Sequence, residues 1–262
     1  MDPRSLVQAY VDSITTGEWE GLSQQVSTRI QYNGRCMTAE DFVSSTWKKC
    51  AKLEPTTTTI DAVVQDPEAG QLAARITSGR NDVVENARHV FCRFTGNLLV
   101  EMWVIDDAAG PRTRASVALR APTWTGAPPS SGASLSETYR SYIGIINDRT
   151  MATELPRYCH ETVTHNGMQM SLDRYSRLMG DAQDAIADLT FDLATLVADE
   201  ERQMVAARIE LTGKPVKVWE GVQPNGRSVA FSEQAIYWFD QGRIRAVVTL
   251  VDTDMYRRQL EE

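Results

Sequence analysis

The sequence predicts an α+β fold in which one cone-shaped α+β-barrel unit, three helices on a curved and mainly antiparallel sheet, occurs twice in tandem. The first observation is a repeat: Asn33–Thr38 returns as Asn166–Ser171, 133 residues later. The second is that, in each half, apolar residues at helical spacing come first and apolar residues at a spacing of two follow, as in α+β domains. A repeat of this length indicates a duplicated domain, because solenoid repeats are much shorter.

The same offset continues along the chain and sets the expected domain boundaries. Residues 66–76 align with residues 199–209 at this offset. We therefore expect a first domain over residues 1–107 and a second over residues 134–262, each long enough to bury a core. Residues 108–133 are rich in Pro, Gly, Ser and Ala, which predicts a linker. Within it, Ala115–Leu119 has the pattern of an additional strand.

The first copy begins with helices and ends with strands. Apolar residues between Leu6 and Ile14 predict a first helix, Trp19–Val26 a short second helix, and Thr28–Tyr32 a strand that ends at an Asn-Gly turn. Thr38 is a helix N-cap followed by acidic residues, which predicts a third helix over Ala39–Lys52. After Pro55 the period changes to two and predicts four strands: Thr57–Val64, Gln71–Thr77, Val83–Phe94 and Leu98–Ile105.

The second copy follows the same plan. A helix is expected over Leu135–Asn147, then a short helix, a strand over Thr162–His165, an Asn-Gly turn, and a third helix that starts at Ser171. The strands expected after it are Leu189–Val197, Gln203–Leu211, Val216–Val222, Arg227–Phe239 and Arg243–Val251. A curved sheet over three helices would form a cone with one open end, which is a common place for a small apolar ligand.

Composition excludes several classes of function. The 262 residues carry a formal net charge of −8 and no Lys/Arg stripe, which argues against a nucleic-acid partner. No apolar run approaches a membrane span, and the start has no signal-peptide pattern. The four cysteines are not spaced as metal ligands, and metal, dinucleotide and nucleotide motifs are missing, so we expect no metal and no cofactor. Unpaired cysteines favour a reducing, cytoplasmic location.

Three stretches carry a resemblance to a known superfamily. They are Val7–Val11 with Gly17–Leu22, Thr162–Gly167, and Phe239–Ile244 eight residues before Asp252. On these residues the chain resembles the nuclear-transport-factor-like superfamily, which includes SnoaL-like polyketide cyclases, ketosteroid isomerase and scytalone dehydratase. The resemblance implies that the two copies pair sheet to sheet as a covalent pseudo-dimer, which is compatible with a monomer. It also implies a small apolar oxygenated metabolite, a polyketide or terpenoid, as substrate.

Strand alternation identifies one candidate without the resemblance. One face of the strand Arg227–Phe239 is apolar or aromatic except for Glu233 in its middle. A carboxyl group among apolar side chains has a raised pKa, which suits acid–base catalysis. The alternative is that a bulge turns Glu233 to solvent or to an interface between the copies.

The resemblance implies further catalytic candidates. His165 matches the general base of ketosteroid isomerase, and the first copy has Tyr32 at this place. Tyr142, with Tyr10 in the first copy, falls near an oxyanion-binding tyrosine. His165 could instead be solvated, and the tyrosines could be core residues with the hydroxyl at the rim.

The end of the last strand adds an acidic candidate. Asp252 closes the apolar series Ile244, Ala246, Val248 and Leu250, and SnoaL-like cyclases place an acidic base near this end. Asp106 is its counterpart in the first copy. The alternative is that Asp252 caps a short terminal helix.

Aromatic and basic residues of the strands have a binding and a structural interpretation. Tyr237, Trp219 and Trp238 could line the mouth of the cone and bind substrate, although such aromatics also serve as sheet packing. The repeated pair Arg75 and Arg208 is placed on the outer sheet face, where ion pairs between the sheets are expected rather than catalysis.

Together these observations predict a cofactor-independent cyclase or isomerase. It would catalyse cyclisation, lactonisation, isomerisation or dehydration of a metabolite, with His165 or Asp252 as base and Tyr142 and Glu233 as donors to the developing oxyanion. The second copy would hold the main site. Two alternatives stay open: a non-catalytic ligand-binding or assembly module, and an epoxide hydrolase that uses Asp252 and Glu233.

Overall fold

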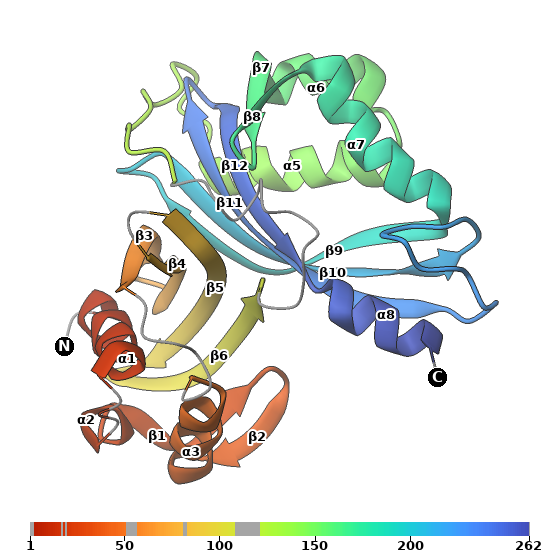
Figure 1. The fold of residues 1–262 in the computed structure, drawn as a ribbon. Coiled ribbons are helices and arrows are strands. Elements are labelled where there is room, and N and C mark those ends of the chain that lie inside the picture. Colours follow the sequence, from red (N-terminus) through yellow and green to blue (C-terminus); the bar gives the residue numbers. More distant parts are fainter. Residues whose placement is uncertain are drawn as a thin grey trace. The chain divides into compact units, whose positions relative to one another are not determined.

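The computed structural model describes residues 3–16, 18, 20–50, 57–80, 83–107 and 121–261, which Figure 1 shows as a ribbon. The chain divides into two compact units, Met1–Ala121 and Pro122–Glu262. Each unit has a hydrophobic core of its own. The additional strand expected at Ala115–Leu119, and the expected end of the third helix at Lys52, lie outside the described residues.

The first unit is a six-stranded sheet with helices. The elements are α1 (Pro3–Thr16), α2 (Glu20–Ser23), β1 (Val26–Tyr32), β2 (Arg35–Thr38), α3 (Ala39–Cys50), β3 (Thr57–Asp66), β4 (Gln71–Arg80), β5 (Val83–Thr95) and β6 (Leu98–Asp106). The strand order is β2-β1-β6-β5-β4-β3, in which β1 and β6 are parallel and all other neighbours antiparallel. Helix α1 packs on β3 and β4, and α3 packs on β1 and β2.

The second unit repeats this topology and adds a terminal helix. The elements are α5 (Leu135–Asn147), α6 (Met151–Tyr158), β7 (Cys159–His165), β8 (Met168–Ser171), α7 (Leu172–Ala185), β9 (Ile186–Asp199), β10 (Met204–Pro215), β11 (Val229–Asp240), β12 (Arg243–Val251) and α8 (Thr253–Glu261). The order β8-β7-β12-β11-β10-β9 matches the first unit strand for strand. Helices α5, α6 and α7 lie along one side of the curved sheet (Figure 1). The predicted tandem α+β fold is therefore confirmed.

Two short strands were not expected. The Asn-Gly turns are followed by β2 and β8, which pair back on β1 and β7, before each third helix begins. In the turns, Asn33 and Asn166 have φ 46° and 44°, and the glycines that follow them have φ 75° and 72°. Positive φ at both central residues is the geometry of a tight type I′ hairpin, and Asn-Gly is the sequence that adopts it most readily.

The asparagine of each turn also fastens the hairpin to the last strand of its sheet. The Asn166 side chain accepts a hydrogen bond from the backbone N–H of Thr249 (2.9 Å) and donates one to the Thr249 carbonyl (3.4 Å). Asn33 makes the same pair of bonds with Val104, at 2.7 and 3.1 Å. The side-chain amide thus satisfies a peptide group of the strand that would otherwise lack a partner. We call this pair of bonds the asparagine clamp.

The segment Val216–Val222 is not a strand, contrary to the prediction from its valines. Strand β10 ends at Pro215, and Val216 and Val218 are each 51% exposed. Glu220 and Gly221 have φ 48° and 72°, so the chain turns and Trp219 bonds back to Val222. The alternating valines have the pattern of a half-buried strand, but their side chains are exposed here and do not pack against a sheet.

The expected inward face of the last strand is wrong, because β12 contains a bulge. Ile244 pairs with Phe239 and Ala246 pairs with Trp238, which leaves Arg245 as an extra residue. After the bulge, Val247 belongs to the core cluster and Val251 packs against it, whereas Ala246, Val248 and Leu250 do not belong to it. The series Ile244, Ala246, Val248 and Leu250 is therefore not one face, because a shift by one residue exchanges the two faces of a strand.

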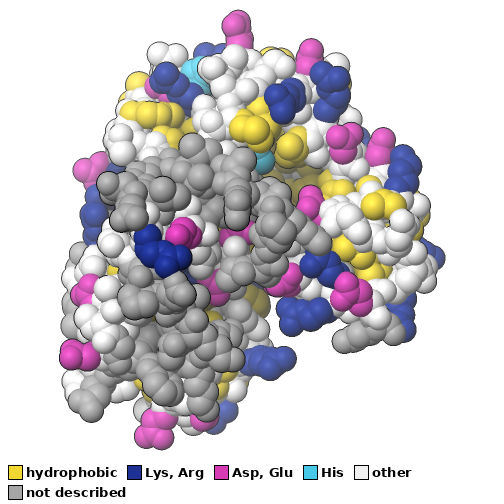
Figure 2. All heavy atoms as spheres, in the orientation of Figure 1, with side chains coloured by type: hydrophobic (Ala, Val, Ile, Leu, Met, Phe, Trp, Pro, Cys, Tyr) yellow, Lys and Arg dark blue, Asp and Glu magenta, His cyan; other side chains and the backbone are white. Residues whose placement is uncertain are grey.

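The described surface carries both signs of charge. On the face shown in Figure 2, Lys and Arg side chains are interspersed with Asp and Glu side chains. No described helix is long and apolar enough to cross a membrane.

Replacing Asn166 by Gly tests the asparagine clamp. Glycine keeps the positive φ of the turn but leaves the backbone groups of Thr249 without the amide, so N166G should lower the free energy of unfolding by about 1–3 kcal/mol. Urea denaturation measures this. The matched control is Q241G: Gln241 also has positive φ (54°), in the hairpin between β11 and β12. Equal effects of the two substitutions would contradict the clamp.

Candidate functional site

The inner face of β11 carries a carboxyl group among core residues, as the alternation predicted. The core residues on this face are Val229, Phe231, Ala235, Tyr237 and Phe239. Glu233 lies between Phe231 and Ala235 on the same face, and its Oε1 accepts a hydrogen bond of 2.6 Å from the Thr249 hydroxyl. Thr249 stands on β12 opposite Ala235, so two adjacent strands present the pair.

Burial dominates the electrostatics of Glu233. Desolvation raises the pKa of this carboxyl, and the hydrogen bond from Thr249 lowers it by a smaller amount, so the net shift is upward. The carboxyl also interacts electrostatically with Tyr139, Tyr175 and Tyr237. A carboxyl group shifted upward in this way exchanges protons closer to neutral pH than an exposed glutamate does.

Four tyrosines surround this position. Tyr139 and Tyr142 come from α5, Tyr175 from α7 and Tyr237 from β11, and none is more than 4% exposed. The hydroxyls of Tyr142 and Tyr175 are hydrogen-bonded at 2.8 Å, and the rings of Tyr139 and Tyr237 lie 4.9 Å apart between centroids. Burial raises the pKa of all four hydroxyls. They are therefore neutral hydrogen-bond donors near pH 7.

His165 lies at the end of β7, beside the tyrosines. Its ring centroid is 5.9 Å from that of Tyr175, and its backbone is in register with Val247, which in turn pairs with Tyr237. Burial lowers the pKa of His165 to about 4. The imidazole is therefore neutral at pH 7 and can accept or donate a hydrogen bond, but it is a weak base.

Tyr139 was not among the residues singled out from the sequence. Its side chain is fully buried, and its hydroxyl has no hydrogen bond of ordinary geometry to any described residue. A signal was present: Leu135, Tyr139 and Tyr142 follow the i, i+4, i+7 spacing of one helix face. The resemblance points to Tyr142 alone, whereas Tyr139 lies one helical turn before it on the same face of α5.

Three other candidates have contacts that differ from those expected. Asp252 follows β12 and caps α8, since its Oδ1 accepts the N–H of Met255 at 2.8 Å. Trp219 packs against Tyr256 of α8, with 4.9 Å between ring centroids. Trp238 is adjacent to Tyr237 on β11 and does not belong to the core cluster. Of the three aromatics expected at the mouth, only Tyr237 lies with the tyrosines.

In the first unit a cation takes the place of the carboxyl group. Val104 is held by the Asn33 clamp and pairs with Val90, just as Thr249 is held by the Asn166 clamp and pairs with Ala235. Arg88 lies two residues before Val90, and Glu233 lies two residues before Ala235. Arg88 therefore occupies the position of Glu233. Arg88 forms an ion pair with Asp106 and donates a 2.8 Å hydrogen bond to the Tyr10 hydroxyl. The first-domain counterparts Tyr10 and Asp106 therefore hold an arginine.

Tyr32 and the repeated arginines have packing and ion-pair contacts within their own units. Tyr32 packs edge-on against Phe42 at 5.3 Å. Arg75 forms an ion pair with Asp61, and Arg208 with Glu210. Arg208 alternates with the core residues of β10, as expected for a residue on the outer face of the sheet. That these arginines form ion pairs between the two sheets stays a prediction.

No three His, Cys, Asp or Glu side chains of the described residues gather as metal ligands. The inner face of the second unit carries the carboxyl group of Glu233, the hydroxyl of Thr249, the neutral imidazole of His165 and the phenols of four tyrosines, and all of them lie on helices and strands. This set can move protons and stabilise a developing oxyanion.

Comparisons with known proteins each cover about half of the chain, and the matching family model lies on the second unit. Residues 136–260 match the family model of SnoaL-like polyketide cyclases. A SnoaL-like polyketide cyclase from Agrobacterium tumefaciens is 30% identical, with 49% of this chain and 98% of that chain covered and a TM-score of 0.46. TsrD from Streptomyces laurentii is 18% identical, with 49% and 96% covered and a TM-score of 0.45. No curated protein sequence matches the chain significantly.

Replacing Thr249 by Val should raise the pKa of Glu233 further, because it removes the hydrogen bond that lowers it. The variant T249S, which keeps a hydroxyl, should stay close to the original pKa. Titration of the Glu233 side-chain carbon by 13C NMR measures both. An unchanged pKa in T249V would contradict the role given to the hydroxyl.

His165 should make the fold sensitive to mild acid. Its pKa is about 4 when folded and 6.5 ordinarily, so the unfolded chain binds the proton more readily and stability falls as pH drops from about 6.5 to 4. The loss is at most about 3 kcal/mol. Thermal unfolding of H165N between these pH values should show a smaller loss. The same loss in H165N would rule out His165 as its source.

Proposed function

The chain belongs to the SnoaL-like polyketide cyclase family, and we propose that its second unit is an acid–base catalyst that cyclises or isomerises a carbonyl-bearing polyketide or terpenoid. The observation that carries the proposal is the buried Glu233 carboxyl, held by Thr249 and surrounded by tyrosines.

Glu233 is the group that moves the proton. As a carboxylate it removes a proton from the carbon next to a substrate carbonyl, which leaves an enolate. The enolate carbon attacks a second carbonyl of the same molecule, so that one C–C bond forms and an alkoxide is left. The protonated Glu233 returns its proton to that alkoxide, and the carboxylate is regenerated. Burial raises the pKa of Glu233, so this carboxyl gains and loses its proton closer to neutral pH than an exposed glutamate does.

The tyrosines supply the hydrogen bonds that a developing oxyanion needs. Tyr139 and Tyr237 are neutral, buried and electrostatically coupled to Glu233, and their hydroxyls interact with each other. A substrate oxygen would replace Tyr237 as the partner of the Tyr139 hydroxyl. In a site from which water is largely excluded, such preorganised donors stabilise an enolate strongly.

His165 and Tyr142 have supporting roles. Tyr142 is hydrogen-bonded to Tyr175, and that pair holds α5 against α7. The neutral imidazole of His165 lies beside Tyr175 and can accept a hydrogen bond from substrate, but its low pKa makes it a poorer base than Glu233. We therefore place the main proton transfer on Glu233 rather than on His165 or on Asp252, which caps α8.

Close packing of the tyrosines favours one second candidate, a ligand-binding module without catalysis. Tyr139, Tyr142, Tyr175 and Tyr237 contact one another and are almost fully buried. A substrate would have to displace some of these contacts on entry. A non-catalytic module that binds a ligand or partner elsewhere on the unit would leave these contacts intact.

The substitution E233Q separates the two functions. It should lower the rate of proton exchange at the α-carbon of a 1,3-diketone probe by about 10²–10⁴-fold, because the amide cannot accept the proton. Deuterium incorporation followed by 1H NMR measures this rate. E201Q, which changes an exposed carboxylate, is the matched control. Exchange that persists in E233Q would remove the proposal, and probe binding without exchange in the original protein would support the binding module.

A further inference from the structure

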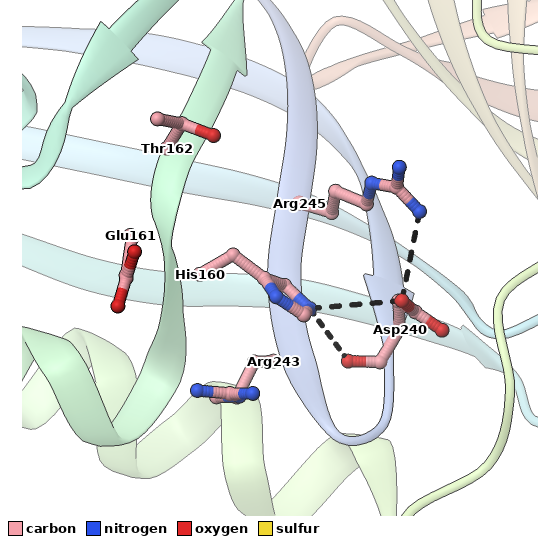
Figure 3. A pocket seen from close by; sticks show the side chains of 6 residues that line it. All are labelled: His160, Glu161, Thr162, Asp240, Arg243 and Arg245. Atoms are coloured by element: carbon pink, nitrogen blue, oxygen red, sulfur yellow. Dashed lines mark hydrogen bonds and ion pairs between the residues drawn. The ribbon is translucent and has the colours of Figure 1, made fainter.

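Two adjoining cavities lie on the second unit where β7 runs beside β12, away from the tyrosines. The larger one, about 460 Å³, is lined by His160, Glu161, Thr162, Asp240, Arg243 and Arg245 (Figure 3). The smaller one, about 270 Å³, shares Thr162 and Arg245 with it and reaches Trp124. His160, Thr162 and Thr164 alternate along β7 with the core residues Cys159 and Val163, so they point away from the core. The cavities are therefore separate from Glu233.

The acidic residue between the basic groups is already compensated. Asp240 Oδ1 accepts the N–H of Ala127 at 3.0 Å. Its Oδ2 lies 3.6 Å from the Arg245 guanidinium and 3.9 Å from His160 Nε2, and His160 also contacts the Asp240 carbonyl at 2.9 Å. In Figure 3 these dashed contacts converge on Asp240, and Glu161 lies on the other side of β7 from His160.

The larger cavity is lined by two arginines and two acidic residues, and Arg243 is the arginine that forms no ion pair there with a described residue. Among the residues that the structure describes, no acidic side chain forms an ion pair with it, and it lies below His160 in Figure 3. Arg245 is fixed from the other side, since its guanidinium stands over the Trp124 ring at 4.9 Å. The bulge at Arg245 creates this arrangement, because it puts an extra residue into β12 next to the hairpin.

We propose that the larger cavity is a binding site for the phosphate group of a small metabolite, with Arg243 as its main ligand. The rest of the metabolite would lie along Thr162 and Arg245, which line both cavities. The volume lies in the range of small-molecule sites. A guanidinium without a carboxylate partner binds phosphate through charge-assisted hydrogen bonds. A phosphate with more than one negative charge is matched to Arg243 together with the loosely paired Arg245 better than a single carboxylate is. This site does not rest on the proposed catalysis.

Titration with inorganic phosphate at constant ionic strength tests the site. The chain has three histidines, so the imidazole C2 proton of His160 can be assigned by comparison with H160N and used as the reporter. We expect a saturable shift with Kd in the millimolar range, weakened about tenfold or more in R243Q. R174Q, which removes an exposed arginine of α7, should bind as the original protein does.

Three outcomes would overturn the proposal. The first is no saturable shift up to about 50 mM phosphate. The second is equal binding by R243Q and the original protein, with the NMR spectrum showing that the variant is folded. The third is acetate binding as tight as phosphate, which would make the site one for carboxylates.

Discussion

The side-chain amide of Asn166 is the constraint on which the proposed site depends. It bonds to both backbone groups of Thr249, and so it joins the β7–β8 hairpin to β12 at one defined register. His165 precedes this asparagine directly, and the Thr249 hydroxyl holds Glu233. One turn therefore fixes the relative positions of an imidazole, a hydroxyl and a carboxyl that come from three strands. Rigid elements of this kind position reacting groups better than loops do.

The first unit has the same clamp and different chemistry. Asn33 holds Val104, which has no hydroxyl to donate, and the position of Glu233 belongs to Arg88. Arg88 is neutralised by Asp106 and bonded to Tyr10. The fold was thus kept through the duplication, while the charge inside it was reversed. This separation agrees with the general observation that function depends on the site rather than on the scaffold.

Opposite faces of one sheet carry different chemical groups in the second unit. On the inner face, burial among tyrosines raises the pKa of a carboxyl and keeps the phenols neutral. On the outer face of β7 and β12, the charged residues are open to solvent and form a cavity of about 460 Å³. The bulge at Arg245 contributes to both, because it turns Val247 and Thr249 inward and places an arginine beside Trp124.

The sequence by itself determined the duplication, the helices-then-strands plan of each copy and the inward position of Glu233, because each of these depends on a local period or a repeated motif. Only the tertiary structure decided which residues meet Glu233. The bulge in β12 has no sequence signal of its own, yet it exchanges the faces of the strand and brings Thr249 inward. Tyr139 comes from a helix about ninety residues before Glu233, so only packing brings it to that carboxyl. The sequence is equally compatible with Asp252 as a base and as a helix cap. The structure shows that α8 begins directly after Asp252 and that this residue caps it.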